Sequence, residues 1–113
     1  MQIAERSVGN VKVLDLSGQI TLTKGDDQLF KDKVNSLVHQ GHKQILVNLA
    51  NVTHVDSAGL GELVGAYTTV TRAGGSMKLV NLTTRLTDLL SITKLLTVFD
   101  TFENEQDALN KFN

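Results

Sequence analysis

The stretch that decides the fold is QILVNLANVTHVDSAGLGELVGAYTTVTR, residues 44–72. Residues 45–49 are aliphatic around a single asparagine, and this pattern predicts a short buried β-strand. Residues 51–55 are more polar and predict a loop. Residues 57–72 return to helical spacing of their apolar side chains and predict a helix. A strand, a loop and a helix in this order are typical of an α/β protein.

The residues before this stretch extend the same pattern. Two runs rich in aliphatic side chains, 3–8 and 11–16, flank Gly9-Asn10 and predict a β-hairpin whose second strand ends at Gly18. Residues 26–40 place apolar side chains at i, i+4, i+7 and i+8, which is one face of a helix. A strand, a helix and another strand imply a right-handed crossover and a parallel pair of strands.

The residues after the stretch predict a further strand, helix and short strand. Residues 77–82 are a strand candidate, and Thr83 or Thr84 can cap the next helix. Residues 98–99 predict a short last strand, and Asn104 resembles the cap of a final helix. The alternation predicts a mixed β-sheet with an N-terminal hairpin and about four helices packed on it.

Length and composition bound the function. The 113 residues predict one α/β domain spanning 1–113, and the lack of cysteine excludes a disulfide scaffold and a thiol nucleophile. A net charge of −1 and 4% aromatic residues do not fit a nucleic-acid binder. No apolar run approaches the ~20 residues that span a bilayer. We therefore expect a cytoplasmic protein that does not insert into membranes.

The predicted helix at 57–72 has an unusual beginning. One acid and five small or apolar residues stand at its start: Asp56, Ser57, Ala58, Gly59, Leu60 and Gly61. Gly59, Gly61 and Gly65 fall in the first two turns, where each glycine costs about 1 kcal/mol relative to alanine. Such residues allow another chain or a ligand to approach closely. Ser57 stands where an N-cap is expected.

Two enzyme-like explanations of this segment fail. The dinucleotide pattern needs a glycine where Val64 stands, and no Lys-Ser or Lys-Thr pair is present beyond it to complete a P-loop. A nucleophile elbow needs a glycine where Val55 stands. Its histidine must also come after Ser57, whereas all three histidines precede it. These histidines lack metal-ligand spacing, so we expect no metal. Because both motifs are incomplete, we also expect no enzyme activity and no cofactor.

Two explanations remain. In the first, Ser57 caps the helix and the glycines permit tight packing on the sheet. In the second, Ser57 is a regulatory phosphoacceptor, since phosphoserine adds roughly −1.5 to −2 charge. The helix dipole would stabilise that charge by about 0.3–1 kcal/mol. A partner packed on the small, nearly neutral surface would meet a dianion beside Asp56 and be repelled.

The segment 56–61 resembles the signature of the STAS domain, and the chain looks most like the stand-alone bacterial anti-anti-sigma factors. Four further stretches fit the family in the same order along the chain, namely 45–49, Leu14-Asp15-Leu16-Ser17-Gly18, 74–80 and 95–99. The resemblance covers essentially the whole chain. It implies a single α/β STAS domain.

The resemblance also implies a mechanism. Ser57 corresponds to the serine phosphorylated by a partner anti-sigma factor, a serine kinase that uses ATP and magnesium. The unphosphorylated protein binds that kinase and frees a sigma factor, and a serine phosphatase resets the switch. The partner surface would comprise 56–61 together with Thr21 and Thr23, on a monomer or weak dimer.

One departure from the family pattern concerns the partner surface. The glycine matching Gly18 is commonly followed within three residues by an acid, and this chain has Thr21 there. Asp26 or Asp27 would have to supply acidity instead. The alternative is a STAS scaffold or transporter-associated subunit with a constitutive interface, in which Ser57 is only a helix cap.

Overall fold

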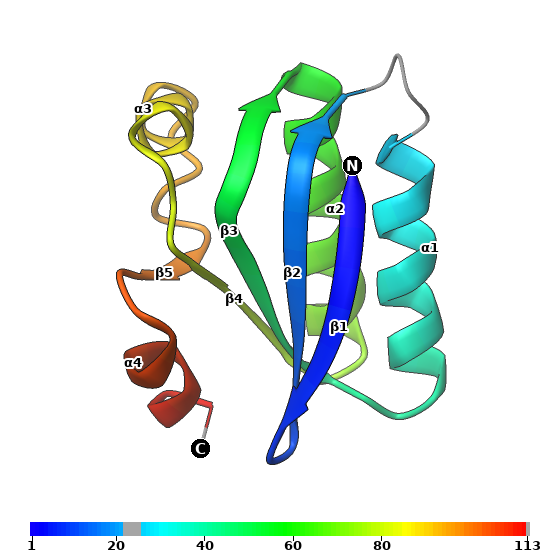
Figure 1. The fold of residues 1–113 in the computed structure, drawn as a ribbon. Helices are drawn as coiled ribbons and strands as arrows, with labels where there is room; N and C mark the ends of the chain where they lie inside the picture. The colour runs from blue at the N-terminus through cyan, green and yellow to red at the C-terminus, as the bar shows by residue number, and fades with distance from the viewer. Residues whose placement is uncertain (22–25, 113) are drawn as a thin grey trace.

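The computed structural model describes residues 1–21 and 26–112. These residues form five strands and four helices (Figure 1), in the order β1 Gln2–Val8, β2 Val11–Ile20, α1 Asp26–His39, β3 Gln44–Val55, α2 Ser57–Arg72, β4 Ser76–Val80, α3 Thr84–Ile92, β5 Asp100–Phe102 and α4 Glu105–Asn110.

The strands form one mixed sheet in the order β1-β2-β3-β4-β5. β1 and β2 pair antiparallel around a turn in which Gly9 has a φ of 58°. The other neighbouring strands pair parallel. Each parallel pair is joined through a helix, as the crossover rule requires. The predicted α/β fold with a leading hairpin is confirmed.

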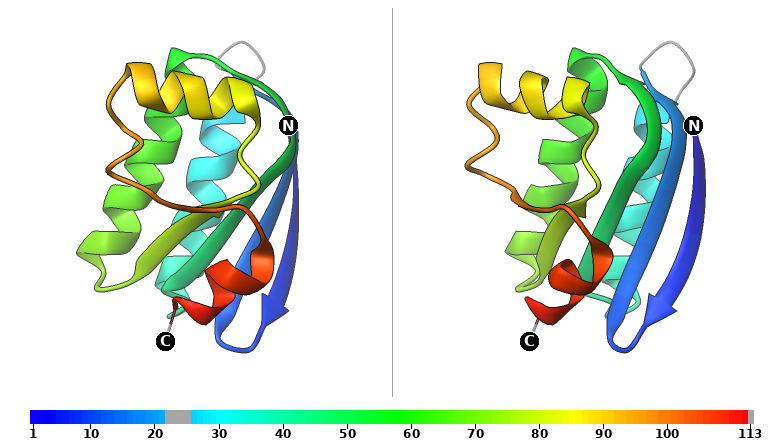
Figure 2. Two further views of the ribbon diagram at one scale, coloured as in Figure 1. Left: turned by 90° about the vertical axis from the view of Figure 1, so that its left-hand side faces the viewer. Right: turned by 60° about the vertical axis from the view of Figure 1, so that its left-hand side comes forward.

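The helices cover the sheet unequally. α1 and α2 lie side by side on one face, and α4 packs on the opposite face (Figure 1). α3 crosses the end of the molecule at which α2 begins (Figure 2). The main core lies under α1, α2 and α3 and is mainly aliphatic, and Phe30 and Leu63 are fully buried in it. A smaller core beneath α4 includes Val13 and Ala108.

A chain of polar side chains crosses the face of the sheet that α4 only partly covers. Arg6 bridges the carboxylates of Asp15 and Glu105, with Nε–Oδ2 and Nη2–Oε1 distances of 2.6 and 2.5 Å. Asn48 donates to Asp15 at 2.8 Å, and Asn81 donates to Asn48 at 3.1 Å. The Arg6 hydrogen bond lowers the pKa of Asp15. These contacts tie α4 to strands β1, β2 and β3 and to Asn81, the residue directly after β4.

Residues 51–55 are not the predicted loop, because β3 continues to Val55. This extension pairs with β2, which itself runs past Gly18 to Ile20. Asn51, Thr53 and His54 are exposed, so the extension lacks the apolar pattern of a buried strand. The pairing skips one residue of β3 opposite Asp15/Ser17 and another opposite Gly18/Gln19, and such bulges bend a strand locally.

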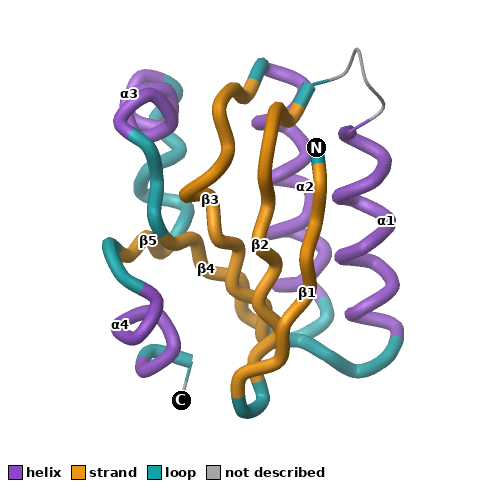
Figure 3. The backbone as a smooth tube through the Cα atoms, viewed as in Figure 1, coloured by secondary structure: helices purple, strands orange, loops and turns teal. Residues whose placement is uncertain are grey.

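The last strand is also displaced from its predicted place. Residues 98–99 lie in the loop between α3 and β5 (Figure 3), and β5 begins at Asp100. Phe99 is buried because its ring packs edge-on against Tyr67, with centroids 5.3 Å apart. β4 ends two residues early, since Asn81 turns the backbone with a φ of 60°. Core packing, and not strand pairing, explains the apolar character of Phe99, whereas Val98 is exposed.

Candidate functional site

The N-cap of α2 is Asp56, not Ser57. Asp56 has extended backbone angles, φ −91° and ψ −177°, and its Oδ1 accepts a hydrogen bond from the Gly59 backbone N–H at 2.8 Å. The first helical hydrogen bond runs from Leu60 N–H to the Asp56 carbonyl at 2.9 Å. The prediction that Ser57 caps the helix was therefore one residue too late.

Ser57 is consequently the first residue of the helix, and its side chain is exposed. Across residues 1–21 and 26–112, the structure gives its hydroxyl no hydrogen-bond partner. The first backbone N–H groups of a helix lack intrahelical partners, and they point toward this end. The site thus presents a free hydroxyl at the positive end of a helix dipole.

Gly59 is needed by the fold of this chain itself. A Cβ at this position would collide with the backbone carbonyl of Ile20, the last residue of β2. The Asp56 N–H also approaches that carbonyl at 3.4 Å. The start of α2 and the end of β2 therefore touch backbone to backbone. The close approach expected of this glycine is made within the molecule.

Gly61 and Gly65 differ from Gly59. Both are exposed, and a Cβ at either position would meet nothing within 4 Å. Neither has the positive φ that would favour glycine. They lie four and eight residues after Ser57, and residues with this spacing share one face of a helix. Contacts within the described fold give no reason for these two glycines.

The remaining residues of the predicted partner surface are distributed unevenly. Ala58 is half-buried, and Leu60 faces the main core with 7% of its surface exposed. Thr21 comes directly after β2 and is 6% exposed. Thr23 lies outside the described residues. The exposed part of the predicted segment is therefore carried by Ser57 and Gly61.

Other candidate side chains add no catalytic or metal-binding arrangement. His54 is exposed at the end of β3. α1 begins at Asp26, but the side chains of Asp26 and Asp27 lie outside the described part of the structure. In that part, no three His, Asp or Glu side chains gather to hold a metal ion. Nor is any described helix long and apolar enough to cross a membrane.

Sequence reasoning missed two features of the site. The first is Ile20, whose contribution is a backbone carbonyl that no side-chain pattern reveals. The second is the capping role of Asp56. Aspartate is as strong an N-cap as serine, so the Asp-Ser pair allowed either start, and only the backbone geometry separates them.

Comparison with known proteins places the chain in a family. The STAS domain family matches residues 2–108. The anti-sigma-B factor antagonist of Bacillus subtilis is 34% identical over 87 residues, which cover 77% of each chain. This chain belongs to the STAS domain family.

Two solved structures share the fold. An anti-sigma factor antagonist from Mycobacterium paratuberculosis superposes with a TM-score of 0.85 at 19% identity, covering 98% of this chain and 92% of that one. The Bacillus cell fate determinant SpoIIAA in its phosphorylated form gives a TM-score of 0.76 at 18% identity, covering 99% and 100%. The family membership supports the expectation that this chain is a binding protein and not an enzyme.

Proposed function

We propose that this chain is an anti-sigma factor antagonist whose binding is switched by phosphorylation of Ser57. In its unphosphorylated form it binds an anti-sigma factor and releases a sigma factor for transcription. The partner is a serine kinase that carries ATP and magnesium, and a serine phosphatase restores the free hydroxyl. The names of the curated relatives support the partner class.

The observation that carries the proposal is the free Ser57 hydroxyl. Asp56 already satisfies the cap, so the helix does not need the serine side chain. An exposed hydroxyl at the first helical position is open to a kinase, and its modification removes no hydrogen bond of the described structure. A serine that capped the helix would have to give up that bond.

The electrostatics of the site favour a binding switch over a folding switch. A phosphate on Ser57 would lie beside the N-terminal N–H groups of α2, where an anion is stabilised by about 0.3–1 kcal/mol. The same phosphate would place roughly −1.5 to −2 charge next to the Asp56 carboxylate on the partner surface. The fold would keep its stability, while a partner packed there would face repulsion and desolvation.

The exposed glycines extend this surface along α2. Gly61 and Gly65 have no side chain and continue the face of Ser57 for two further turns. A partner backbone can approach such a strip more closely than it can approach an ordinary helix. Thr21 lends no charge to the surface, so the partner of this chain must complement a less acidic site than the family usually offers.

A binding experiment with three forms of the protein tests the proposal. Wild type, Ser57→Ala and Ser57→Glu are used as baits in a lysate of the source cells, and the captured proteins are identified by mass spectrometry. We expect wild type and Ser57→Ala to retain an anti-sigma factor of the kinase class and Ser57→Glu to lose it.

The setting we propose is the cytoplasm, with the protein acting as a monomer or weak dimer.

Retention of one partner by all three baits would contradict the switch. It would instead support a constitutive STAS scaffold or transporter-associated subunit. A matched control is Ser91→Glu, because Ser91 is exposed near the end of α3 and lies outside the proposed surface. This control introduces the same charge elsewhere and should leave capture unchanged.

A further inference from the structure

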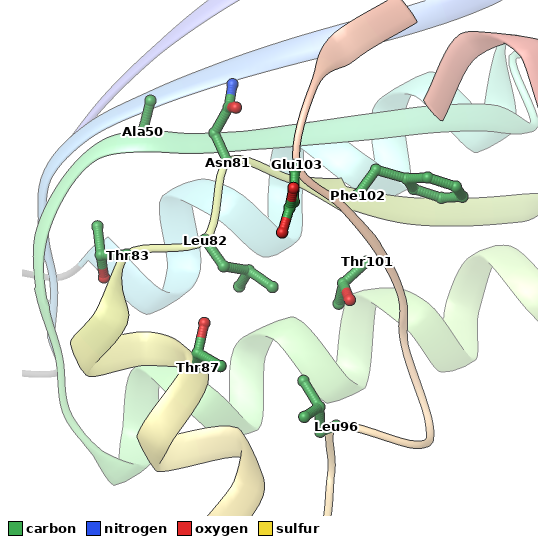
Figure 4. Close-up of a pocket in the computed structure, with 9 residues that line it drawn as sticks. All are labelled: Ala50, Asn81, Leu82, Thr83, Thr87, Leu96, Thr101, Phe102 and Glu103. Carbon is green, nitrogen blue, oxygen red and sulfur yellow. The ribbon is translucent and has the colours of Figure 1, made fainter. Parts of the chain in front are cut away.

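A cavity of about 660 Å³ lies outside the carboxyl ends of β4 and β5. Its walls come from α3, from the loop after α3 and from residues at the ends of the two strands (Figure 4). Binding sites for small molecules usually measure roughly 300–1,000 Å³. The carboxyl ends of parallel strands are also where α/β proteins commonly hold ligands.

Three polar side chains line this cavity. Figure 4 shows the Glu103 carboxylate and the Thr87 and Thr101 side chains pointing into the same space from different elements. Within the described residues, none of the three makes a side-chain hydrogen bond or ion pair. A carboxylate and a hydroxyl oxygen both accept hydrogen bonds, and the Glu103 carboxylate is exposed to solvent at the cavity.

The rest of the lining is apolar or already engaged. Leu82 and Leu96 point into the cavity and give it an aliphatic wall (Figure 4). The Thr83 hydroxyl oxygen accepts the Leu86 N–H as the cap of α3, and Asn81 donates to Asn48. Among the described residues of the lining, Glu103 alone is charged, and no described lysine, arginine or histidine of the lining offsets it.

We propose that this cavity binds a small aliphatic amine in its protonated form. The ammonium group pairs with the Glu103 carboxylate, and the alkyl chain lies against Leu82 and Leu96. An ammonium group has three donors and no acceptor, which matches a wall that offers acceptors. An anion would be repelled by the Glu103 carboxylate, and a neutral hydrocarbon would gain no attraction from it. This site is independent of the switch proposed for Ser57.

Titration with three probes of equal chain length tests the ligand class. Hexylamine, hexanol and hexanoate are added to the labelled protein at neutral pH, and backbone amide shifts are followed by NMR. For a fragment with so few atoms we expect a Kd on the order of 1 mM. Hexylamine should shift the amides of residues 82, 87, 101 and 103 in a saturable way, hexanol should bind more weakly, and hexanoate should leave them unmoved.

Two variants with the same loss of charge locate the amine. Glu103→Gln keeps the side-chain shape and should weaken hexylamine binding about tenfold. Asp88→Asn removes an exposed carboxylate of α3 outside the lining and should bind like wild type. Ser57→Ala should also bind like wild type, which separates this site from the switch.

Three results would overturn the proposal. The first is hexanoate or hexanol shifting the same amides as strongly as hexylamine. The second is unchanged hexylamine affinity in Glu103→Gln, provided that its spectrum shows a folded protein. The third is the lack of any saturable shift at the cavity.

Discussion

The starts of α2 and α3 have the same cap and different surfaces. Asp56 and Thr83 each accept a hydrogen bond from the backbone N–H three residues on, Gly59 in one helix and Leu86 in the other. Both capping residues have extended backbone angles. Capping therefore explains Asp56 and Thr83 equally well, and it explains no other side chain in either first turn.

The two helices differ in the residues after the cap. α3 continues with Thr84 and Arg85, residues without a backbone requirement, whereas α2 continues with an exposed serine and has glycine at 59, 61 and 65. Gly59 is required by the carbonyl of Ile20, but Gly61 and Gly65 face open space. One glycine at the start of α2 therefore serves the fold, whereas the described structure gives Ser57, Gly61 and Gly65 no such role.

The largest effect is expected from Gly59→Ala. The added methyl group would overlap the Ile20 carbonyl, and overpacking of this kind costs about 2–3 kcal/mol. Urea unfolding of this variant should show a midpoint well below that of wild type. An unchanged midpoint would mean that β2 and α2 do not touch as the structure shows.

The Arg6–Asp15 ion pair on the other face of the sheet gives a comparison that does not involve the start of α2 or α3. Asp15→Asn removes the charge that Arg6 binds and should lower stability by about 1 kcal/mol, a modest value because Arg6 is partly exposed to solvent. Because the pKa of Asp15 is lowered by folding, wild type should keep this contribution above the unfolded pKa of about 3.9 and lose it as the pH falls further.

Unfolding measured at neutral pH and at acid pH checks both statements. Wild type and Asp15→Asn should differ at neutral pH and converge in acid. A difference that persists unchanged in acid would rule out the ion pair as its source. Asp56→Ala should cost the same in either background, since the two sites are far apart along the fold.

The caps provide the next comparison. Asp56→Ala and Thr83→Ala each remove one capping hydrogen bond and should each lower stability by about 1 kcal/mol. Ser57→Ala should leave stability nearly unchanged, because its hydroxyl caps nothing. Thermal unfolding of the three variants in one buffer gives the comparison. If Ser57→Ala lost as much stability as Asp56→Ala, Ser57 and not Asp56 alone would cap the helix.

The smallest effects on stability are expected at the exposed glycines. Gly61→Ala and Gly65→Ala should each raise the free energy of unfolding by about 0.5–1 kcal/mol, since alanine favours a helix and nothing obstructs its methyl group. If these glycines serve partner binding, the same variants should weaken it. Stabilised variants that bind the partner as well as wild type does would remove the functional explanation for the glycines.

The fold was largely predictable because its signals are local. Helical spacing placed α2 at 57–72, and the Gly9-Asn10 turn placed the hairpin. The extension of β3 was missed because pairing with β2 holds its polar residues in a strand, and pairing is a long-range property. Phe99 was misassigned for a similar reason, since its apolar character serves the contact with Tyr67.

The candidate site was only partly predictable. The segment 56–61 stood out because glycine is costly in a helix, and this signal needs no structure. The different roles of Gly59 and Gly61 depend on whether a neighbouring strand approaches, which the sequence does not encode locally. The same holds for the cap, because Asp56 and Ser57 are equally suitable residues and the backbone decides between them.

The central claim is that Ser57 accepts a phosphate that its own helix tolerates and its partner does not. The most direct measurement is phosphate mapping after incubation with the captured partner, ATP and magnesium. We predict one phosphate on Ser57 in wild type, none in Ser57→Ala, and an unfolding midpoint of the phosphorylated protein close to that of the unmodified one. A phosphate on another residue, or no phosphate at all, would contradict the account.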